Sequence, residues 1–157
     1  MADKNQADLY LDRAPGIGLL LSRAQVLYRA RLTELIEGHK VHIGHVQILC
    51  ALQKQSGSPV APLTQTRLGR ITGIEKSSLV LFLDDMEKRG WVQRQSHPSD
   101  RRAYVIALTP VGLKRHAAIN KVVEACEQDV LSFLTKSQRA VFSAFLAELV
   151  QKLEYKN

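Results

Sequence analysis

The chain has 157 residues, enough for one compact domain that folds alone or is completed by a partner. An apolar content of 45% with 24% charged residues is typical of a globular protein in water, and no apolar run approaches the roughly 20 residues of a membrane span. The polar N-terminus lacks the pattern of a secretory signal, so we expect a cytoplasmic protein. The net charge of +7 favours a polyanionic partner, although it does not by itself exclude an enzyme.

The N-terminal part of the chain is predicted to form two helices. Across residues 16–37 apolar side chains recur every three or four positions, which indicates a long amphipathic helix, and Gly38 is its expected stop. A second helix is predicted over about residues 42–54. Residues 55–62 combine glycine, serine and proline and therefore indicate a loop. The predicted buried positions of the second helix are Val46, Ile48, Leu49, Ala51 and Leu52.

A short helix is predicted after this loop. Thr64 is a suitable cap for a helix over about residues 65–72, because its hydroxyl can accept an unpaired amide at the helix start. Gly73 then makes the turn that separates this helix from the next element.

The apolar run at residues 79–83 would pass for a buried strand by composition alone. Its flanks favour a helix, because Glu75 is an acid at the start and residues 88–90, Lys-Arg-Gly, place bases and a glycine at the end. The predicted buried stripe of this helix is Leu79, Leu83 and Met86.

A β-hairpin and two helices complete the chain. Residues 91–96 and 103–108 have the composition of short strands, and residues 97–102, His-Pro-Ser-Asp-Arg-Arg, indicate a basic turn between them. Thr109 followed by Pro110 predicts the start of a helix that reaches about residue 133. Thr135 begins the last helix, whose apolar stripe is wide enough to require burial. That stripe is Val141, Phe142, Phe145, Leu146, Leu149, Val150 and Leu153.

Two helices joined by a glycine turn and followed by a basic hairpin describe a winged helix-turn-helix. A helix fits the major groove of DNA, and an arginine on a thin loop can enter the adjacent minor groove. Residues 63–103 carry eight Lys and Arg against five Asp and Glu, whereas residues 41–62 carry one base and no acid. We therefore expect a mainly α fold with a small β-hairpin wing and a function in binding double-stranded DNA.

The sequence resembles the MarR family of bacterial regulators over nearly its full length. The resemblance lies in Leu-Gly-Arg-Ile-Thr-Gly-Ile at 68–74, in residues 84–94, and above all in Asp-Arg-Arg-Ala at 100–103 with Leu-Thr-Pro-Val-Gly at 108–112. It implies a single MarR-like domain over residues 1–157, with a winged-helix lobe at about 42–110 and dimerisation helices at about 12–38 and 110–155. The expected function is that of a homodimeric transcriptional repressor on a pseudo-palindromic operator.

The resemblance makes the helix near residues 75–89 the recognition helix. Ser77 and Ser78 then lie near its exposed first turn, where they either donate to DNA or remain solvated serines of the cap region. Lys76 and Arg67 are expected to contact phosphates rather than bases.

In the wing, the resemblance implies that Asp100 braces an arginine and that Arg102, with Arg101 as the competing candidate, reaches the minor groove. A solvated turn with incidental charge is the alternative. The chain departs from the family pattern at Val80 and Leu81, where many members carry a polar residue and an arginine. Leu81 would then either contact a thymine methyl group or turn into the core.

Members of the family often bind small aromatic or phenolic anions between the dimerisation helices and the DNA-binding lobe. By position, Arg23, Tyr28 and His45 are the candidates for such an effector site. Each has a structural alternative: an ion pair at the dimer interface for Arg23, the core for Tyr28, and a satisfied, partly buried histidine for His45.

Other function classes receive less support. No glycine-rich phosphate loop or nucleophile elbow is present, so we expect neither an enzyme nor a cofactor. His39, His42 and His45 are three apart, but the first precedes the predicted helix, and we expect no metal site. Cys50 and Cys126 are expected to be buried, reduced thiols, with a redox role as the alternative. A winged helix that docks proteins instead of DNA remains a further alternative.

Overall fold

The structure is a computed structural model that describes residues 16–55, 63–97 and 104–154. The three residues predicted for the wing tip, Asp100, Arg101 and Arg102, lie outside these described ranges. Within them, no helix is long and apolar enough to cross a membrane. The elements in chain order are α2 (Ile17–Ile36), the 3₁₀ helix η1 (Glu37–His39), α3 (Ile43–Gln55), α4 (Gln65–Thr72), α5 (Lys76–Lys88), β1 (Val92–Ser96), β2 (Tyr104–Leu108), α6 (Pro110–Val130) and α7 (Lys136–Glu154).

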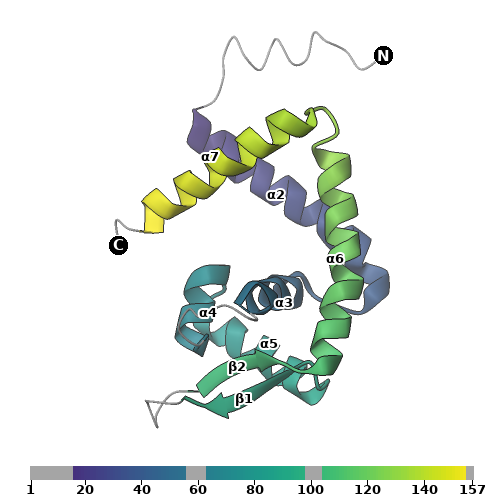
Figure 1. Cartoon of the computed structure of the whole chain (residues 1–157), viewed down its shortest axis with the longest axis vertical. Coiled ribbons are helices and arrows are strands. Elements are labelled where there is room, and N and C mark those ends of the chain that lie inside the picture. Colours follow the sequence, from purple (N-terminus) through teal and green to yellow (C-terminus); the bar gives the residue numbers. More distant parts are fainter. Residues whose placement is uncertain (1–15, 56–62, 98–103, 155–157) are drawn as a thin grey trace.

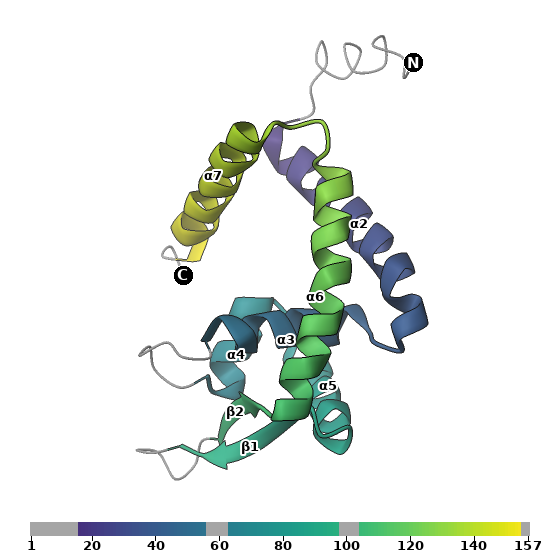
Figure 2. The ribbon, with the colours of Figure 1, turned by 45° about the vertical axis from the view of Figure 1, so that its right-hand side comes forward.

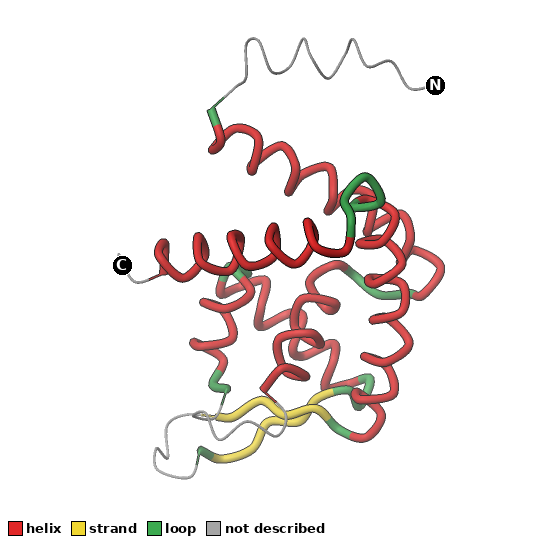
Figure 3. Tube along the Cα trace, turned by 45° about the horizontal axis from the view of Figure 1, so that its top comes forward, coloured by secondary structure: helices red, strands yellow, loops and turns green. Residues whose placement is uncertain are grey.

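The chain forms a compact lobe from which a long helix rises (Figure 1). Helices α3, α4 and α5 pack with the β1–β2 hairpin in this lobe, and α6 leads away from it toward α2 and α7. Figure 2 shows α6 as the connection between the lobe and the upper helices. The expected mainly α fold with a two-stranded hairpin is thereby confirmed, and Figure 3 shows how small the strand content is.

The hairpin is antiparallel, and its second strand also pairs with the segment before α4. Its register pairs Val92 with Leu108 at one end and Ser96 with Tyr104 at the other. The amide of Ile106 also donates to the carbonyl of Leu63, 2.9 Å away, so that the segment before α4 lies against β2. The base of the wing is therefore fixed to the helix-turn-helix on the side of α4.

The lobe has its own core, to which α5 contributes one face. Leu79, Leu83 and Met86 are buried, as predicted from the helical reading of this segment, and residues 79–83 are not a strand. The five positions predicted for α3 are also buried. The buried cluster consists of Ile48, Leu49, Ala51, Leu52, Leu63, Leu68, Leu79, Leu83, Met86, Trp91, Val92 and Ile106.

The predicted caps of α4 and α6 are confirmed. The hydroxyl of Thr64 accepts from the amide of Arg67 at 3.3 Å, and that of Thr109 accepts from the amide of Gly112 at 3.0 Å. The turn before α5 and the end of α5 use glycines in the left-handed region, Gly73 at φ 65° and Gly90 at φ 67°. Local sequence signals were sufficient at these sites because each cap is made within a few residues of the chain.

Helix α2 ends at Ile36, close to the predicted end at about residue 37, but Gly38 is not the residue that stops the helical turns. Helix α2 instead tightens into η1, and the left-handed residue is Lys40 at φ 53°. Arg89 donates to the carbonyl of Lys40 at 3.0 Å, and Arg115 donates to the carbonyl of His39. Contacts with α5 and α6 thus hold a conformation that glycine would adopt more readily.

A second, smaller core lies where α2, α3 and α6 meet. It consists of Leu32, Ile36, Ile43, Val46, Ile119 and Cys126. By contrast, α7 has no buried residue, and its predicted apolar stripe lies on the surface of the single chain. The strongly exposed apolar residues of α2 and α7 include Ile17, Leu19, Val26, Leu27, Val141, Phe145, Val150 and Leu153.

Candidate nucleic-acid interface

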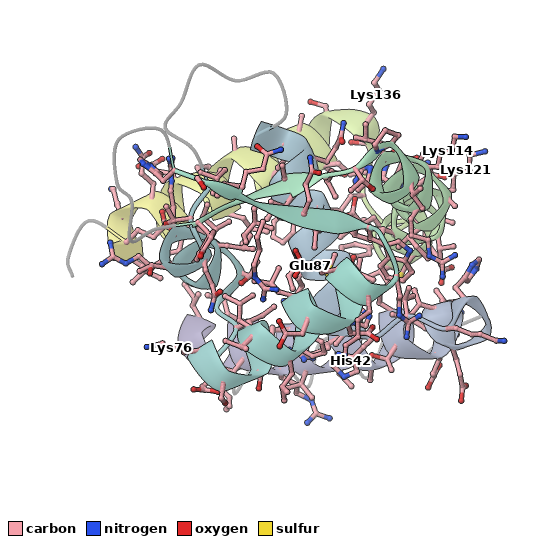
Figure 4. The ribbon with its side chains drawn as sticks, turned by 90° about the horizontal axis from the view of Figure 1, so that it is seen from below. His42, Lys76, Glu87, Lys114, Lys121 and Lys136 are labelled. Atoms are coloured by element: carbon pink, nitrogen blue, oxygen red, sulfur yellow. The ribbon has the colours of Figure 1, made fainter. Side chains whose placement is uncertain are left out.

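Helix α5 and the hairpin lie together on the lower side of the lobe, as Figure 4 shows from below. Leu79, Leu83 and Met86 turn one face of α5 into the core, so the opposite face looks outward. Lys76, Ser77 and Lys88 are exposed on this helix, and Lys76 stands at its free N-terminal end (Figure 4). The lobe therefore presents one outward helix face beside a two-stranded ribbon.

The N-terminus of α5 is capped by Glu75. Its Oε2 accepts from the amides of Ser77 at 3.0 Å and Ser78 at 3.2 Å, and the hydroxyl of Ser77 also donates to it. These hydrogen bonds, the one from the Ser77 hydroxyl first, hold the pKa of Glu75 below its usual value. The sequence placed an acid at this helix start but did not identify it as the acceptor for both serines. The Ser77 hydroxyl therefore faces Glu75.

Of the two alternatives for Leu81, the structure excludes burial in the core. Leu81 is 70% exposed, so it does not turn into the core, whereas Val80 is half-buried. Arg67, the second predicted phosphate contact, is half-buried on α4, where it lines an open depression with Arg70 and Glu154. Lys76 thus has the exposure that a phosphate contact requires, and Arg67 has it only in part.

Arg94 on β1 clamps the hairpin to α5. Its guanidinium donates to Asp84 Oδ1 at 2.5 Å and to Glu87, and its own amide donates to Glu87 Oε1 at 3.1 Å. Burial lowers the pKa of Arg94, but the hydrogen bonds to Asp84 and Glu87 outweigh this effect and raise it. Figure 4 shows Glu87 between α5 and the strands. Sequence analysis missed this clamp; the only signal for it was an arginine within a short strand that follows an acidic helix end.

His45, a predicted effector-site residue, is buried in the lobe. Its Nδ1 accepts from the amide of His42 at 3.1 Å, so the ring proton is assigned to Nε2, which lies 3.2 Å from Asp85 Oδ2. The ring packs edge-on against Phe82 and Trp91, with centroids 5.1 and 5.8 Å away. Burial lowers the pKa of His45 to about 4, although Asp85 acts in the opposite direction.

The other two predicted effector residues lie elsewhere. Tyr28 packs against the second core, where burial and then Glu127 raise its pKa to about 12. Arg23 is exposed on α2. Within the described residues, Tyr28 thus lies at the second core and His45 packs against Phe82 and Trp91 in the lobe, while Arg23 is exposed.

A cavity of about 270 Å³ lies between α2, α3 and the turn before α5. Arg29 supplies a cation to it, and His42 stacks on Phe82 with centroids 4.8 Å apart. Gly44 in its wall has no room for a side chain, because a Cβ there would overlap the Phe82 ring. Its remaining lining residues are Gln47, Thr72, Gly73, Ile74, Glu75 and Ser78. Sequence analysis did not identify this cavity, because its walls come from four separate segments.

The described part of the chain offers little support for metal binding or for cysteine reactivity. Within it, no three His, Cys, Asp or Glu side chains are grouped so as to hold a metal ion. Cys126 is buried and Cys50 is half-buried, and burial raises the pKa of both thiols. A raised pKa disfavours the thiolate, which is the reactive form.

An outward helix after a glycine turn, capped at its start and clamped to a two-stranded ribbon, defines a winged helix-turn-helix protein. The sequence profile of the MarR family matches residues 60–104. The transcriptional regulator PecS of Dickeya dadantii is 30% identical over 136 residues, which cover 85% of this chain and 79% of that protein. The chain belongs to the MarR family.

Further relatives agree with this assignment. A putative transcriptional regulatory protein for the hcr operon of Thauera aromatica is 29% identical over 90 residues, or 57% of this chain, and the match spans about half of that relative, 54% of its length. The apo form of MarR from E. coli superimposes with a TM-score of 0.71 at 20% identity, covering 86% of this chain and 96% of that one. BpsR of Bordetella bronchiseptica, whose DNA binding is regulated by 6-hydroxynicotinic acid, gives a TM-score of 0.71 at 21% identity, with 87% and 94% covered. At these identities the structural likeness establishes the fold.

Proposed function

We propose that this chain is a sequence-specific DNA-binding transcriptional repressor that acts in the cytoplasm as a homodimer and has no catalytic activity. The observation that carries the proposal is the placement of the outward face of α5 and the hairpin on one side of the lobe (Figure 4). In such an arrangement the helix enters the major groove and the wing reaches the neighbouring minor groove. A mutant of MarR from E. coli with the same fold was solved in complex with operator DNA, at a TM-score of 0.69.

The exposed apolar side chains of α2 and α7 support a homodimer. A helix of 19 residues with no buried side chain leaves its apolar stripe in water, which is unfavourable by about 25 cal/mol per Å². A second copy would bury the stripes of α2 and α7 and place two lobes around a two-fold axis. The operator would then be pseudo-palindromic, with half-sites about one helical turn apart.

The wing tip is proposed to supply the minor-groove contact. Arg102, with Arg101 as the competing residue and Asp100 as the brace, belongs to the segment that joins β1 and β2. We expect Arg102→Ala to weaken operator binding by about 1 to 3 kcal/mol at matched salt. Arg70→Ala, on the exposed surface of α4, is the control for simple loss of one positive charge. Unchanged affinity of the Arg102 variant would remove the wing from the interface.

A small aromatic or phenolic anion is proposed to lower the affinity for the operator. The cavity beside α5 supports this, because Arg29 offers a positive charge and the stacked pair of His42 and Phe82 an aromatic wall. Its lining joins α2 to the start of α5, so an occupant would contact both the dimerisation helices and the DNA-binding lobe. We expect a coupling free energy of about 1 to 3 kcal/mol between effector and operator. Arg23, Tyr28 and His45 remain predicted contributors.

The decisive experiment selects genomic fragments that bind the protein and footprints them with and without 6-hydroxynicotinic acid and a panel of phenolic acids. The proposal expects two protected half-sites related by symmetry and a loss of protection with at least one acid. One asymmetric half-site would contradict the dimer. Failure to retain any duplex DNA would contradict DNA binding and favour a protein-docking module. An acid that binds without changing operator affinity would contradict the regulatory mechanism.

A further inference from the structure

The outward face of α5 carries a leucine whose side chain is mostly exposed. Leu81 is 70% exposed, whereas Leu79 and Leu83, two residues to either side, are 2% and 1% exposed. Successive helical residues are rotated by about 100°, so Leu81 lies almost opposite the buried stripe. The side chain therefore points away from the core, at the centre of the face proposed to enter the major groove.

The surroundings of Leu81 make this face compatible with DNA. Two acids lie one turn further along the helix, and each is engaged by an arginine: Asp84 by Arg94 at 2.5 Å and Asp85 by Arg89 at 2.7 Å. One turn before Leu81, the hydroxyl of Ser77 donates to the capping carboxylate of Glu75. The Ser77 hydroxyl and the carboxylates of Asp84 and Asp85 therefore already have partners within the protein, whereas the apolar side chain of Leu81 points outward and can meet a base.

We propose that Leu81 determines part of the operator sequence by packing against the C5-methyl group of a thymine. This inference rests on the proposed DNA-binding function. In the major groove the other positions of the base pairs present hydrogen-bond donors and acceptors, and the thymine methyl is the apolar group that an aliphatic side chain can contact favourably. Over a cytosine amino group or a guanine acceptor, Leu81 would displace water and offer no hydrogen bond in return. The chain thus selects a thymine by burial of a methyl group, without a bidentate hydrogen bond.

The test removes single methyl groups from the DNA. In an operator obtained by selection, each thymine is replaced in turn by deoxyuridine, symmetrically in both half-sites, and dissociation constants are measured at fixed salt for the wild type and for Leu81→Ala. We expect one symmetric thymine pair whose replacement weakens wild-type binding by about fourfold per methyl group, the ratio that corresponds to about 0.8 kcal/mol of buried CH₂. Leu81→Ala should bind less tightly and should not respond to uracil at that pair.

A conservative variant sharpens the result. Leu81→Met keeps an apolar side chain and should keep the response to uracil. If wild type and Leu81→Ala respond identically to uracil at every position, the assignment of Leu81 is overturned while DNA binding stands. If the wild type retains no duplex DNA, the proposed function fails and this inference fails with it.

Discussion

The buried histidine of the lobe should make the folded state sensitive to acid. His45 is 5% exposed, and burial lowers its pKa from 6.5 to about 4. In the unfolded chain the same imidazole takes up a proton near pH 6.5, so between pH 6.5 and about 4 the unfolded state binds more protons than the folded one. Stability that is fully present above pH 6.5 is therefore lost as the pH falls through this window. Linkage gives a loss of about 2 kcal/mol near pH 5 and about 3 kcal/mol near pH 4.

The assay is urea unfolding at a fixed protomer concentration, since the proposed dimer would make apparent stability depend on concentration. Free energies of unfolding are compared for the wild type and His45→Gln at several pH values between about 7 and 4. The other titrating groups, including His116, contribute to both proteins. The pH dependence of the difference in free energy of unfolding between wild type and His45→Gln therefore isolates the contribution of His45. The groups that face His45 and set its pKa are Asp85, Arg89, His42 and Arg115. An NMR titration of the His45 ring in the folded wild type provides a second measurement that does not depend on the variant.

A ring that titrates near pH 6.5 in the folded protein would refute this reasoning, and so would a difference between the two proteins that is independent of pH. In either case Asp85, 3.2 Å from Nε2, would stabilise the protonated ring as strongly as burial disfavours it. The contact between α3 and α5 would then be an ion pair and not an approach of Asp85 to a neutral ring.

Three other substitutions have defined outcomes. Phe145→Asp should give monomers in sedimentation experiments. Phe145 is 66% exposed in the single chain, and a charge there would be buried without a partner in the proposed dimer. A stable dimer of this variant would contradict the proposed interface. Gly112→Ala should lower the free energy of unfolding by about 3 kcal/mol, because a Cβ there overlaps the carbonyl oxygen of Trp91, and wild-type urea stability would disprove that contact. Arg94→Gln should lower the free energy of unfolding by about 1 kcal/mol or less, since Asp84 and Glu87 are substantially exposed. The same substitution should weaken operator binding by at least as many kcal/mol as it lowers stability, because it removes the clamp between β1 and α5. Equal operator affinities of wild type and Arg94→Gln in a binding titration would show that the clamp does not orient the wing.

Much of the fold was predictable because its signals are local. The caps at Thr64 and Thr109 and the glycine turns at Gly73 and Gly90 each depend on a few adjacent residues, and all four were correctly predicted. The helical reading of residues 79–83 also succeeded from its flanks. The same helical periodicity that buries Leu79 and Leu83 places Leu81 on the outer face, so the sequence alone could have excluded a core position for Leu81.

The parts that sequence analysis missed are made by contacts between distant segments. Arg89 and Arg115 reach back to the end of η1, and no local pattern announces that a lysine will adopt a left-handed conformation there. The cavity beside α5 depends on α2 and α3 as well as on the turn before α5. Likewise, the grouping of Arg23, Tyr28 and His45 was a prediction from position along the chain, and their places in the fold differ.

The attachment of η1 to the lobe has an evolutionary consequence. The acceptors at His39 and Lys40 are backbone carbonyls, which every amino acid supplies, while the donors are the guanidinium groups of Arg89 and Arg115. Substitutions on the acceptor side that tolerate the left-handed backbone at Lys40 can therefore accumulate without loss of these hydrogen bonds. Each arginine, by contrast, also lies over the Trp91 ring, at 5.0 and 5.1 Å, and lysine does not replace it on equal terms. Among close relatives, the connection between α2 and the DNA-binding lobe should be preserved through these two arginines and the tryptophan over which both lie, while the sequence of the segment that they hold varies.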